Sequence, residues 1–313
     1  MSGHDGHHHH HDHFGNPDAT RLRAIRCGPI AQEILGEDGE IVVIAVFDRS
    51  FYLACPRGIV CIGSDIGAGP INVEMQAAPH DSWETAGIRP DMEGRIEHGV
   101  PYLTENLALD ISGARIWEPP VAPSFDKATA AVSLARLKAQ ATPLLPADGL
   151  AALVLTGKAN TKNIEAQMAA ASLAELRNGL VRSVPEHAPD ERLARAATLL
   201  VGLGPGLTPS GDDVLAGVML ALSIAGRTTT RDALWHALTP ELDALTVPIS
   251  AMHLSAAADG MASELMHALL EAILTNSENL GPSLRAAART GHTSGWDTIA
   301  GIVLGLEAVL ASM

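Results

Sequence analysis

One segment of this chain occurs twice, and the repeat constrains the fold more than any other feature. Residues 209–222 and 293–306 lie 84 positions apart and are identical at seven of fourteen positions. Each copy begins with Ser-Gly-x-Asp and continues as a run of small and aliphatic residues typical of a closely packed helix. Gly217 and Gly301, at equivalent positions, would let another helix approach closely. We therefore predict that the two helices pack on each other, or on equivalent neighbours, with pseudo-twofold symmetry.

The rest of the chain predicts an α+β protein with a β-rich N-terminal domain of meander or barrel type, followed by an all-α domain with an internal pseudo-repeat. The β-rich domain should span residues 24–120, and the helical domain residues 124–313, which hold GLGPGLTPSGDD and GHTSGWD. The proline-rich segment 119–123 marks the boundary. Strands are expected at 41–47, 51–55, 59–62, after the glycine-rich loop 67–73, and at 114–117. Helices are expected at 127–141, 163–180, 191–201, 213–225, 231–245, 249–274, 281–289 and 297–312.

The net charge, the apolar runs and the cysteine spacing exclude several kinds of binding partner. A formal charge of −15 argues against nucleic acid, whose phosphates need a basic surface, but it leaves small anions open. The longest apolar run expected, 214–225, is too short to span a membrane, and no signal peptide is recognised. Cys27, Cys55 and Cys61 match no zinc motif and are expected to be free thiols. We expect a cytoplasmic protein with no membrane partner, for which a homo-oligomer is an open alternative.

Residues 1–20 form a histidine-rich tail containing His4, His7–His11 and His13. Such a tract binds Ni²⁺ or Zn²⁺ whether it is native or a purification tag. It is expected to be disordered and unrelated to the mechanism.

The glycine-rich start of the first repeat helix is the strongest candidate site. Gly204 and Gly206 allow positive φ, and Thr208 or Ser210 suits a helix N-cap. Backbone N–H groups here, Gly211 included, lack partners within the helix and can bind a small anionic substrate or phosphate. Ser294 and Gly295 are the counterparts in the second copy. The simpler interpretation is capping, because an Asp near a helix N-terminus contributes up to about 1 kcal/mol without any function.

Asp213 and Asp297 are candidate catalytic residues on equivalent helical positions, and they conflict with an anion site because carboxylates compete for the same N–H groups. Either the carboxylates orient the loop, or Mg²⁺ or a basic partner bridges them to the ligand, with Asp212 a candidate metal ligand. No cofactor is certain. His292 stands where Thr208 stands in the first copy and is either an acid/base or a cap.

Weaker signals lie elsewhere. Asn72 is the polar side chain of the loop 67–73, which is either a turn or a wall of the ligand site. Ser250 and His253 share a helix face but lack the third group of a catalytic triad. His236 and His267 fit apolar helices as ordinary, partly buried histidines.

The segment 202–213, with 291–297 and the loop 69–73, resembles the AllH subunit family of oxamate carbamoyltransferase over roughly residues 25–310. This resemblance implies a cytoplasmic subunit acting with FdrA-like and AllG-like subunits in allantoin breakdown, a branch of purine degradation. The implied reaction converts oxalurate and phosphate into oxamate and carbamoyl phosphate, with paralogues on other carbamoyl compounds.

Within that reaction, Thr208, Ser210 and Ser294 would bind phosphate or substrate oxygens, and His292 would protonate the leaving nitrogen. Asp213 and Asp297 would fix the loop geometry or hold a divalent ion. Two alternatives remain open: a non-catalytic scaffold subunit of that complex, and a stand-alone small-ligand or metal-binding protein.

Overall fold

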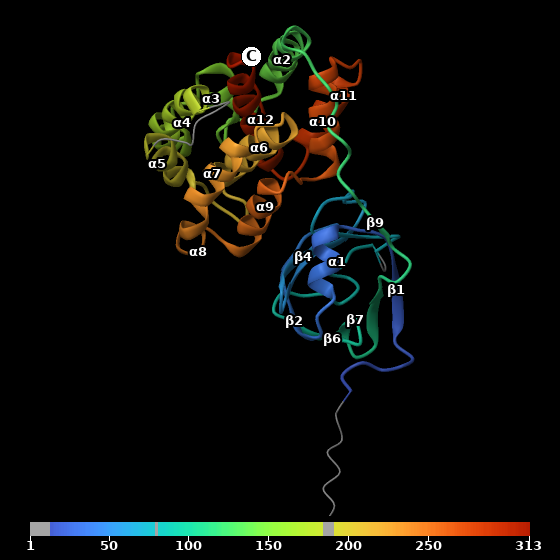
Figure 1. Cartoon of the computed structure of the whole chain (residues 1–313). Helices are drawn as coiled ribbons and strands as arrows, with labels where there is room; N and C mark the ends of the chain where they lie inside the picture. Colours follow the sequence, from blue (N-terminus) through green and yellow to red (C-terminus); the bar gives the residue numbers. More distant parts are fainter. Residues whose placement is uncertain (1–12, 79–80, 184–190) are drawn as a thin grey trace, which may run out of the picture. The chain divides into compact units, whose positions relative to one another are not determined.

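The computed structural model describes residues 13–78, 81–183 and 191–313. The chain divides into two compact units, Met1–Trp117 and Glu118–Met313, with the division directly before the proline-rich segment (Figure 1). A β-rich region followed by a helical region, as predicted, is confirmed, with about 49% helix and 17% strand. His4 and His7–His11 lie outside the described residues.

The first unit is a mixed β-barrel of eight strands. Its strands are β1 (Thr20–Cys27), β2 (Gly39–Val46), β3 (Ser50–Cys55), β4 (Gly58–Ser64), β5 (Asn72–Met75), β6 (Glu93–Glu97), β7 (Val100–Thr104) and β8 (Leu107–Asp110). They follow the order β5-β4-β3-β2-β6-β7-β8-β1, and an antiparallel β1–β5 pairing closes the barrel. The short β9 (Arg115–Ile116) pairs in parallel with β1, and α1 (Pro29–Leu35) follows β1 in the chain.

Alternating buried and exposed side chains explain why some strands of this barrel could be predicted. Phe51 and Leu53 point into the core, while Tyr52 and Ala54 between them are more exposed, because successive strand residues face opposite sides. Strands β2, β3 and β4 form the predicted antiparallel meander. Strand β6, which contains a glycine and three charged residues, was not predicted. Strands β1, β7 and β8 and helix α1 were not predicted as separate elements.

The second unit is helical. Its α-helices are α2 (Lys127–Ala141), α3 (Ala151–Thr156), α4 (Ile164–Ser183), α5 (Glu191–Leu200), α6 (Ser210–Ile224), α7 (Thr228–Leu238), α8 (Leu242–Leu245), α9 (Pro248–Ala258), α10 (Glu264–Thr275), α11 (Leu280–Ala288) and α12 (Ser294–Ala311). The single helix expected at 249–274 is wrong: Gly260, with φ +79°, ends α9, and α10 starts after Ser263. The helix expected at 231–245 is interrupted at Thr239–Glu241, around Pro240. The short α3 was not predicted.

The two repeat helices, α6 and α12, pack directly on each other at the centre of the helical unit (Figure 1). A Cβ placed on Gly217 would lie 2.9 Å from the Cα of Gly301 and overlap the Thr298 carbonyl oxygen. A Cβ on Gly301 would lie 3.0 Å from the Cα of Gly217 and overlap the Val214 carbonyl oxygen. Each glycine therefore admits the backbone of the other helix, and the predicted pseudo-symmetric contact is present.

Helix α12 also corrects an expectation about hydropathy. Among the described residues it is the one helix long and apolar enough to cross a membrane by length and composition alone, with mean hydropathy 1.3. In this structure 78% of it is buried within the protein. A core helix of a packed bundle passes the same criterion, so the feature is weak evidence for a membrane span.

Candidate functional site: two helix starts with paired carboxylates

The starts of α6 and α12 have the same construction. The Gly211 N–H donates to the Leu203 carbonyl over 2.9 Å, and the Gly295 N–H donates to the Thr290 carbonyl over 2.9 Å. A Cβ on Gly211 would overlap a carbonyl oxygen at the end of α5, and a Cβ on Gly295 would overlap one at the end of α11. The repeated glycine therefore lets each preceding helix pass close to the start of the next.

Asp213 and Asp297 come together at these two starts. Both are buried, with 6% and 0% of their surface exposed. The Ser294 hydroxyl is hydrogen-bonded to Asp213, and the Ser210 hydroxyl is hydrogen-bonded to Asp297. These hydrogen bonds link the two copies of the repeat. The sequence repeat has thus produced a reciprocal pair of Ser–Asp contacts, which brings four predicted site residues into one cluster.

Burial and mutual repulsion change how these acids ionise. Desolvation, and then the charge of Asp297, raise the pKa of Asp213 well above its ordinary value. Desolvation raises the pKa of Asp297 to about 6, against the lowering effects of the Ser210 hydroxyl and the Leu150 N–H. The two carboxyl groups therefore titrate as a pair that holds a proton more strongly than either would in water.

A third segment, which the sequence analysis did not identify, completes the cluster. The Leu150 N–H donates to Asp297 Oδ1 over 2.8 Å. The Asn163 amide holds this segment by donating to the Gly149 carbonyl over 2.8 Å. Glu165, in the first turn of α4, adds a negative charge that raises the pKa of Asp297. A backbone donor leaves no side-chain signature, so Leu150 gave no sequence signal.

Both carboxylate oxygens of Asp212 accept hydrogen bonds that hold the local structure together. Its Oδ1 accepts the Gly202 N–H over 2.8 Å, and its Oδ2 accepts the Ser250 hydroxyl over 2.6 Å and the Thr246 hydroxyl. Asp212 thus fastens the glycine-rich loop to the start of α9. Ser250 is bonded to Asp212 in this way, which gives it a structural partner. The second copy has Trp296 at this position, also buried.

The glycine-rich loop has the backbone that its sequence predicts. Gly204 and Gly206 adopt φ +121° and +86°, and Thr208 is partly buried. The predicted N-cap is wrong: Pro209 is the N-cap of α6 and makes no side-chain cap hydrogen bond, and Ser210 is the first residue of the helix. The N–H groups of Gly211 and Gly295, which were predicted to bind an anion, instead donate to carbonyl groups of the chain. For these two residues the role shown by the structure is close packing.

His292 lies at the exposed rim of the same cluster. Its Nε2 lies 3.3 Å from Asp148 Oδ2, and the two side chains are 80% and 72% exposed. The adjacent Thr293 carbonyl accepts the Asp297 N–H, so the histidine directly precedes the first turn of α12. Asp148 was missed because nothing in the sequence around it resembles a motif.

Asn72 belongs to the other unit. It starts strand β5, and its side chain donates to the Gly67 carbonyl over 3.3 Å. Among the histidines considered, His267 is buried and its Nε2 accepts the Ala262 N–H over 3.1 Å. Burial lowers the pKa of His267 to about 4, so this histidine is neutral at physiological pH.

Few groups of side chains in this structure are arranged to bind a metal ion. The described parts of the chain hold no group of three or more His, Cys, Asp or Glu residues arranged to bind a metal ion. Both oxygens of Asp212 are already engaged as acceptors. Asp213 Oδ2 and Asp297 Oδ2 are buried with no hydrogen-bond partner.

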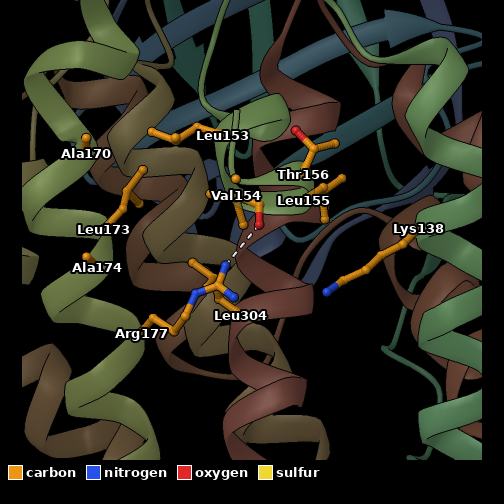
Figure 2. A pocket seen from close by; sticks show the side chains of 11 residues that line it. Lys138, Leu153, Val154, Leu155, Thr156, Ala170, Leu173, Ala174, Arg177 and Leu304 are labelled. Atoms are coloured by element: carbon orange, nitrogen blue, oxygen red, sulfur yellow. Dashed lines mark hydrogen bonds between the residues drawn. The ribbon is translucent and has the colours of Figure 1, made fainter. Parts of the chain in front are cut away.

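A separate cavity of about 390 Å³ lies beside α3, α4 and α12 and contains none of the predicted site residues (Figure 2). Arg177 reaches across it to donate to the Val154 carbonyl over 2.9 Å. At its edge, Lys138 Nζ lies 2.7 Å from Glu307 Oε1. Leu150, which contacts Asp297, directly precedes α3, and the last residues of α3 line this cavity.

No solved structure matches this chain. The match among protein families covers the region that holds both helix starts and the paired carboxylates. Residues 200–306 match the family model described as oxamate carbamoyltransferase subunit AllH, which confirms the resemblance found in the sequence over that part of the chain.

Proposed function

We propose that this chain is a subunit of an oxamate carbamoyltransferase-type complex and that its duplicated helix starts form part of the reaction centre. The observation that carries this proposal is the coincidence of two results. The family match covers residues 200–306, and within that span the acids of both repeat copies meet as one buried pair. Perturbed carboxyl groups in a polar cluster are typical of functional sites.

The proposed reaction is phosphorolysis of an N-carbamoyl compound, with oxalurate as the substrate. A phosphate oxygen attacks the carbamoyl carbon, the bond from that carbon to the amide nitrogen breaks, and the nitrogen takes up a proton. The products are carbamoyl phosphate and oxamate. Such a reaction needs a proton donor for the leaving nitrogen and donors that stabilise the carbonyl oxygen as it gains negative charge.

His292 is the residue we assign to the proton transfer. It is exposed, so substrate can reach it, and Asp148 beside it can orient the ring. Thr208 and Ser294, which are partly exposed, supply hydroxyl groups for phosphate or substrate oxygens, whereas Ser210 is buried against Asp297. Because Asp213 and Asp297 are buried, their role is to fix the two helix starts relative to each other or to hold an ion.

Partners and location follow from the same proposal. A subunit works with other subunits, here FdrA-like and AllG-like proteins. Exposed apolar side chains near the glycine-rich loop, among them Ile164 and Leu207 at 68% and 40% exposed, offer a contact surface. Free cysteines, two of them buried, fit a reducing cytoplasm.

The test is reconstitution of the complex with the FdrA-like and AllG-like subunits, followed by assay of carbamoyl phosphate formed from oxalurate and phosphate. The proposal expects turnover that depends on this chain and falls at least about 100-fold in His292→Ala, the usual contribution of an acid/base group. The exposed Asp243→Asn, on α8, is the matched control and should keep full activity. Absence of turnover in a complex that assembles correctly would refute the proposed reaction.

The alternative is a scaffold subunit, which the burial of the acid pair favours, because a side chain with 0% exposure cannot touch substrate directly. In that case the complex containing His292→Ala would turn over at the wild-type rate, while omission of this chain would abolish activity. The same assay therefore separates the catalytic role from the scaffold role.

A further inference from the structure

The cluster at the two helix starts is rich in carboxyl groups, which become negatively charged when a bound cation displaces the proton that the pair otherwise holds. Asp212, Asp213, Asp297 and Glu165 converge there, and within the described residues none of these carboxylates takes part in an ion pair. The N-termini of α4, α6 and α12 provide only partial compensation, roughly half a positive charge each. An anion would add to the imbalance, so the electrostatics favour a positively charged ligand.

Two acceptor atoms specify where such a ligand would sit. Asp213 Oδ2 and Asp297 Oδ2 each have almost no contact with solvent and no hydrogen-bond partner. A buried carboxylate oxygen without a partner is costly, because desolvation is not offset by any contact. Their residues occupy equivalent positions on helices whose backbones touch at Gly217 and Gly301. The charge of Asp297 also acts on Asp213, so the two carboxyl groups lie near each other.

The chemistry of the donors indicates the kind of ion. The groups present are carboxylates and the hydroxyls of Ser210 and Ser294, all hard oxygen donors, with no thiolate and no imidazole among the buried members. Oxygen-only sites suit Mg²⁺, Mn²⁺ or Ca²⁺ rather than softer metals. Mg²⁺ commonly binds through one or two carboxylates and keeps several waters. Asp213 and Asp297 supply two carboxylates, which fits that pattern, and the described residues hold no group of three or more His, Cys, Asp or Glu residues arranged to bind a metal ion.

We propose that the starts of α6 and α12 form a binding site for one divalent cation of the Mg²⁺ class, with Asp213 Oδ2 and Asp297 Oδ2 as its protein ligands. The Ser210 and Ser294 hydroxyls support the ion or its waters. Two carboxylates neutralise its double charge, and the equivalent positions of the ligands mean that the sequence repeat builds the site. This inference stands on the geometry alone.

The test is binding of Mg²⁺ and Mn²⁺ to the full chain after removal of metal with EDTA, measured by calorimetry and by the electron paramagnetic resonance signal of free Mn²⁺. We expect one site with a dissociation constant of about 1 mM or tighter in the wild type, in the range of weak oxygen-ligand sites. Affinity should fall at least about tenfold in Asp213→Asn and in Asp297→Asn. Asp243→Asn, an exposed carboxylate outside the cluster, should bind as the wild type does.

Two controls keep the result interpretable. The histidine-rich tail is present in every sample, so binding common to all variants belongs to the tail. Asn has the shape of Asp, and circular dichroism verifies the fold; Ser294→Ala, a milder change, should weaken binding by a smaller factor. Wild-type protein that binds neither ion at about 10 mM, well above the range of such sites, would overturn the proposal. Unchanged binding in both Asn variants would do the same.

This experiment uses neither substrate nor partner subunits. Failure of the cation site therefore leaves the proposed reaction standing, and absence of turnover in the reconstituted complex leaves the cation site standing.

Discussion

Replacing Gly217 by Ala tests the central contact of the helical unit. The new Cβ would lie 2.9 Å from the Cα of Gly301 and 2.8 Å from the backbone nitrogen of Ile302. It would also overlap the Thr298 carbonyl oxygen. All three atoms belong to the backbone of α12, so no side chain can rotate away. Helices α6 and α12 must move apart by about 1 Å to reach ordinary contact distances.

The magnitude follows from two opposing effects. Overpacking a core typically costs about 1–3 kcal/mol, and a backbone neighbour that cannot adjust places this site at the upper end. Ala is a better helix former than Gly and returns up to about 1 kcal/mol. The net loss in the free energy of unfolding should therefore be about 2 kcal/mol or more, which lowers Tm by roughly 4–8 °C in a unit of this size.

The assay is urea denaturation of the full chain followed by far-ultraviolet circular dichroism, with Gly217→Ala and Gly301→Ala compared. Gly281→Ala is the matched control: it is also a buried helical glycine, but its new Cβ would meet Gln140 Oε1 at 2.8 Å and Arg285 Nη1 at 3.2 Å. These are ends of flexible side chains, so the control should be neutral or slightly more stable. If the two interface variants are as stable as Gly281→Ala, the close contact between the repeat helices is refuted.

Three further predictions concern buried polar groups. In metal-free buffer, the free energy of unfolding should fall by about 3 kcal/mol as pH rises from about 4 to about 6, because folding raises the pKa of Asp297 and disfavours its charged form. In Asp297→Asn, the urea midpoint should change less with pH over that range. The pKa of His267 is lowered in the folded protein, so its contribution to the free energy of unfolding is lost as pH falls from about 6.5 towards 4. His267→Gln should therefore make Tm less sensitive to acid, and an unchanged dependence of Tm on pH would contradict this. Asp212→Ala removes the hydrogen-bond acceptor for Gly202, Thr246 and Ser250. The free energy of unfolding measured in urea should fall by about 2–4 kcal/mol. An unchanged value would show that the glycine-rich loop does not depend on Asp212.

Local patterns predicted the elements whose cause is local. Branched residues with alternating burial gave β2, β3 and β4, and helical periodicity gave α2 with both of its ends. Closure of the barrel depends on β1 pairing with β5 and β8, which are distant in the chain, so no local pattern reports it. The break between α9 and α10 was missed because apolar periodicity continues across it. Gly260 and Ser263, the N-cap residue of α10, mark the break.

The site was predictable to the extent that it is duplicated. Ser210 and Asp213 recur as Ser294 and Asp297 at the same spacing, so two helices that pack through Gly217 and Gly301 must bring them together. The contribution of Leu150 is a backbone N–H, which any residue could supply. Sequence reasoning can find such a donor only after the fold has placed its segment.

The preference for an anion at these helix starts rested on unpaired N–H groups, and here the chain satisfies some of them itself. The Gly211 and Gly295 N–H groups donate to preceding carbonyls, because each glycine-rich turn folds back on the end of the helix before it. Each first turn also carries its own carboxylate, which interacts favourably with the positive end of the helix dipole. Once both copies meet, the two carboxylates oppose each other in a buried space, and the electrostatic requirement of the site changes sign. A helix N-terminus with an aspartate in its first turn therefore predicts an anion site only when it stands alone, and a cation or proton site when two of them are packed together.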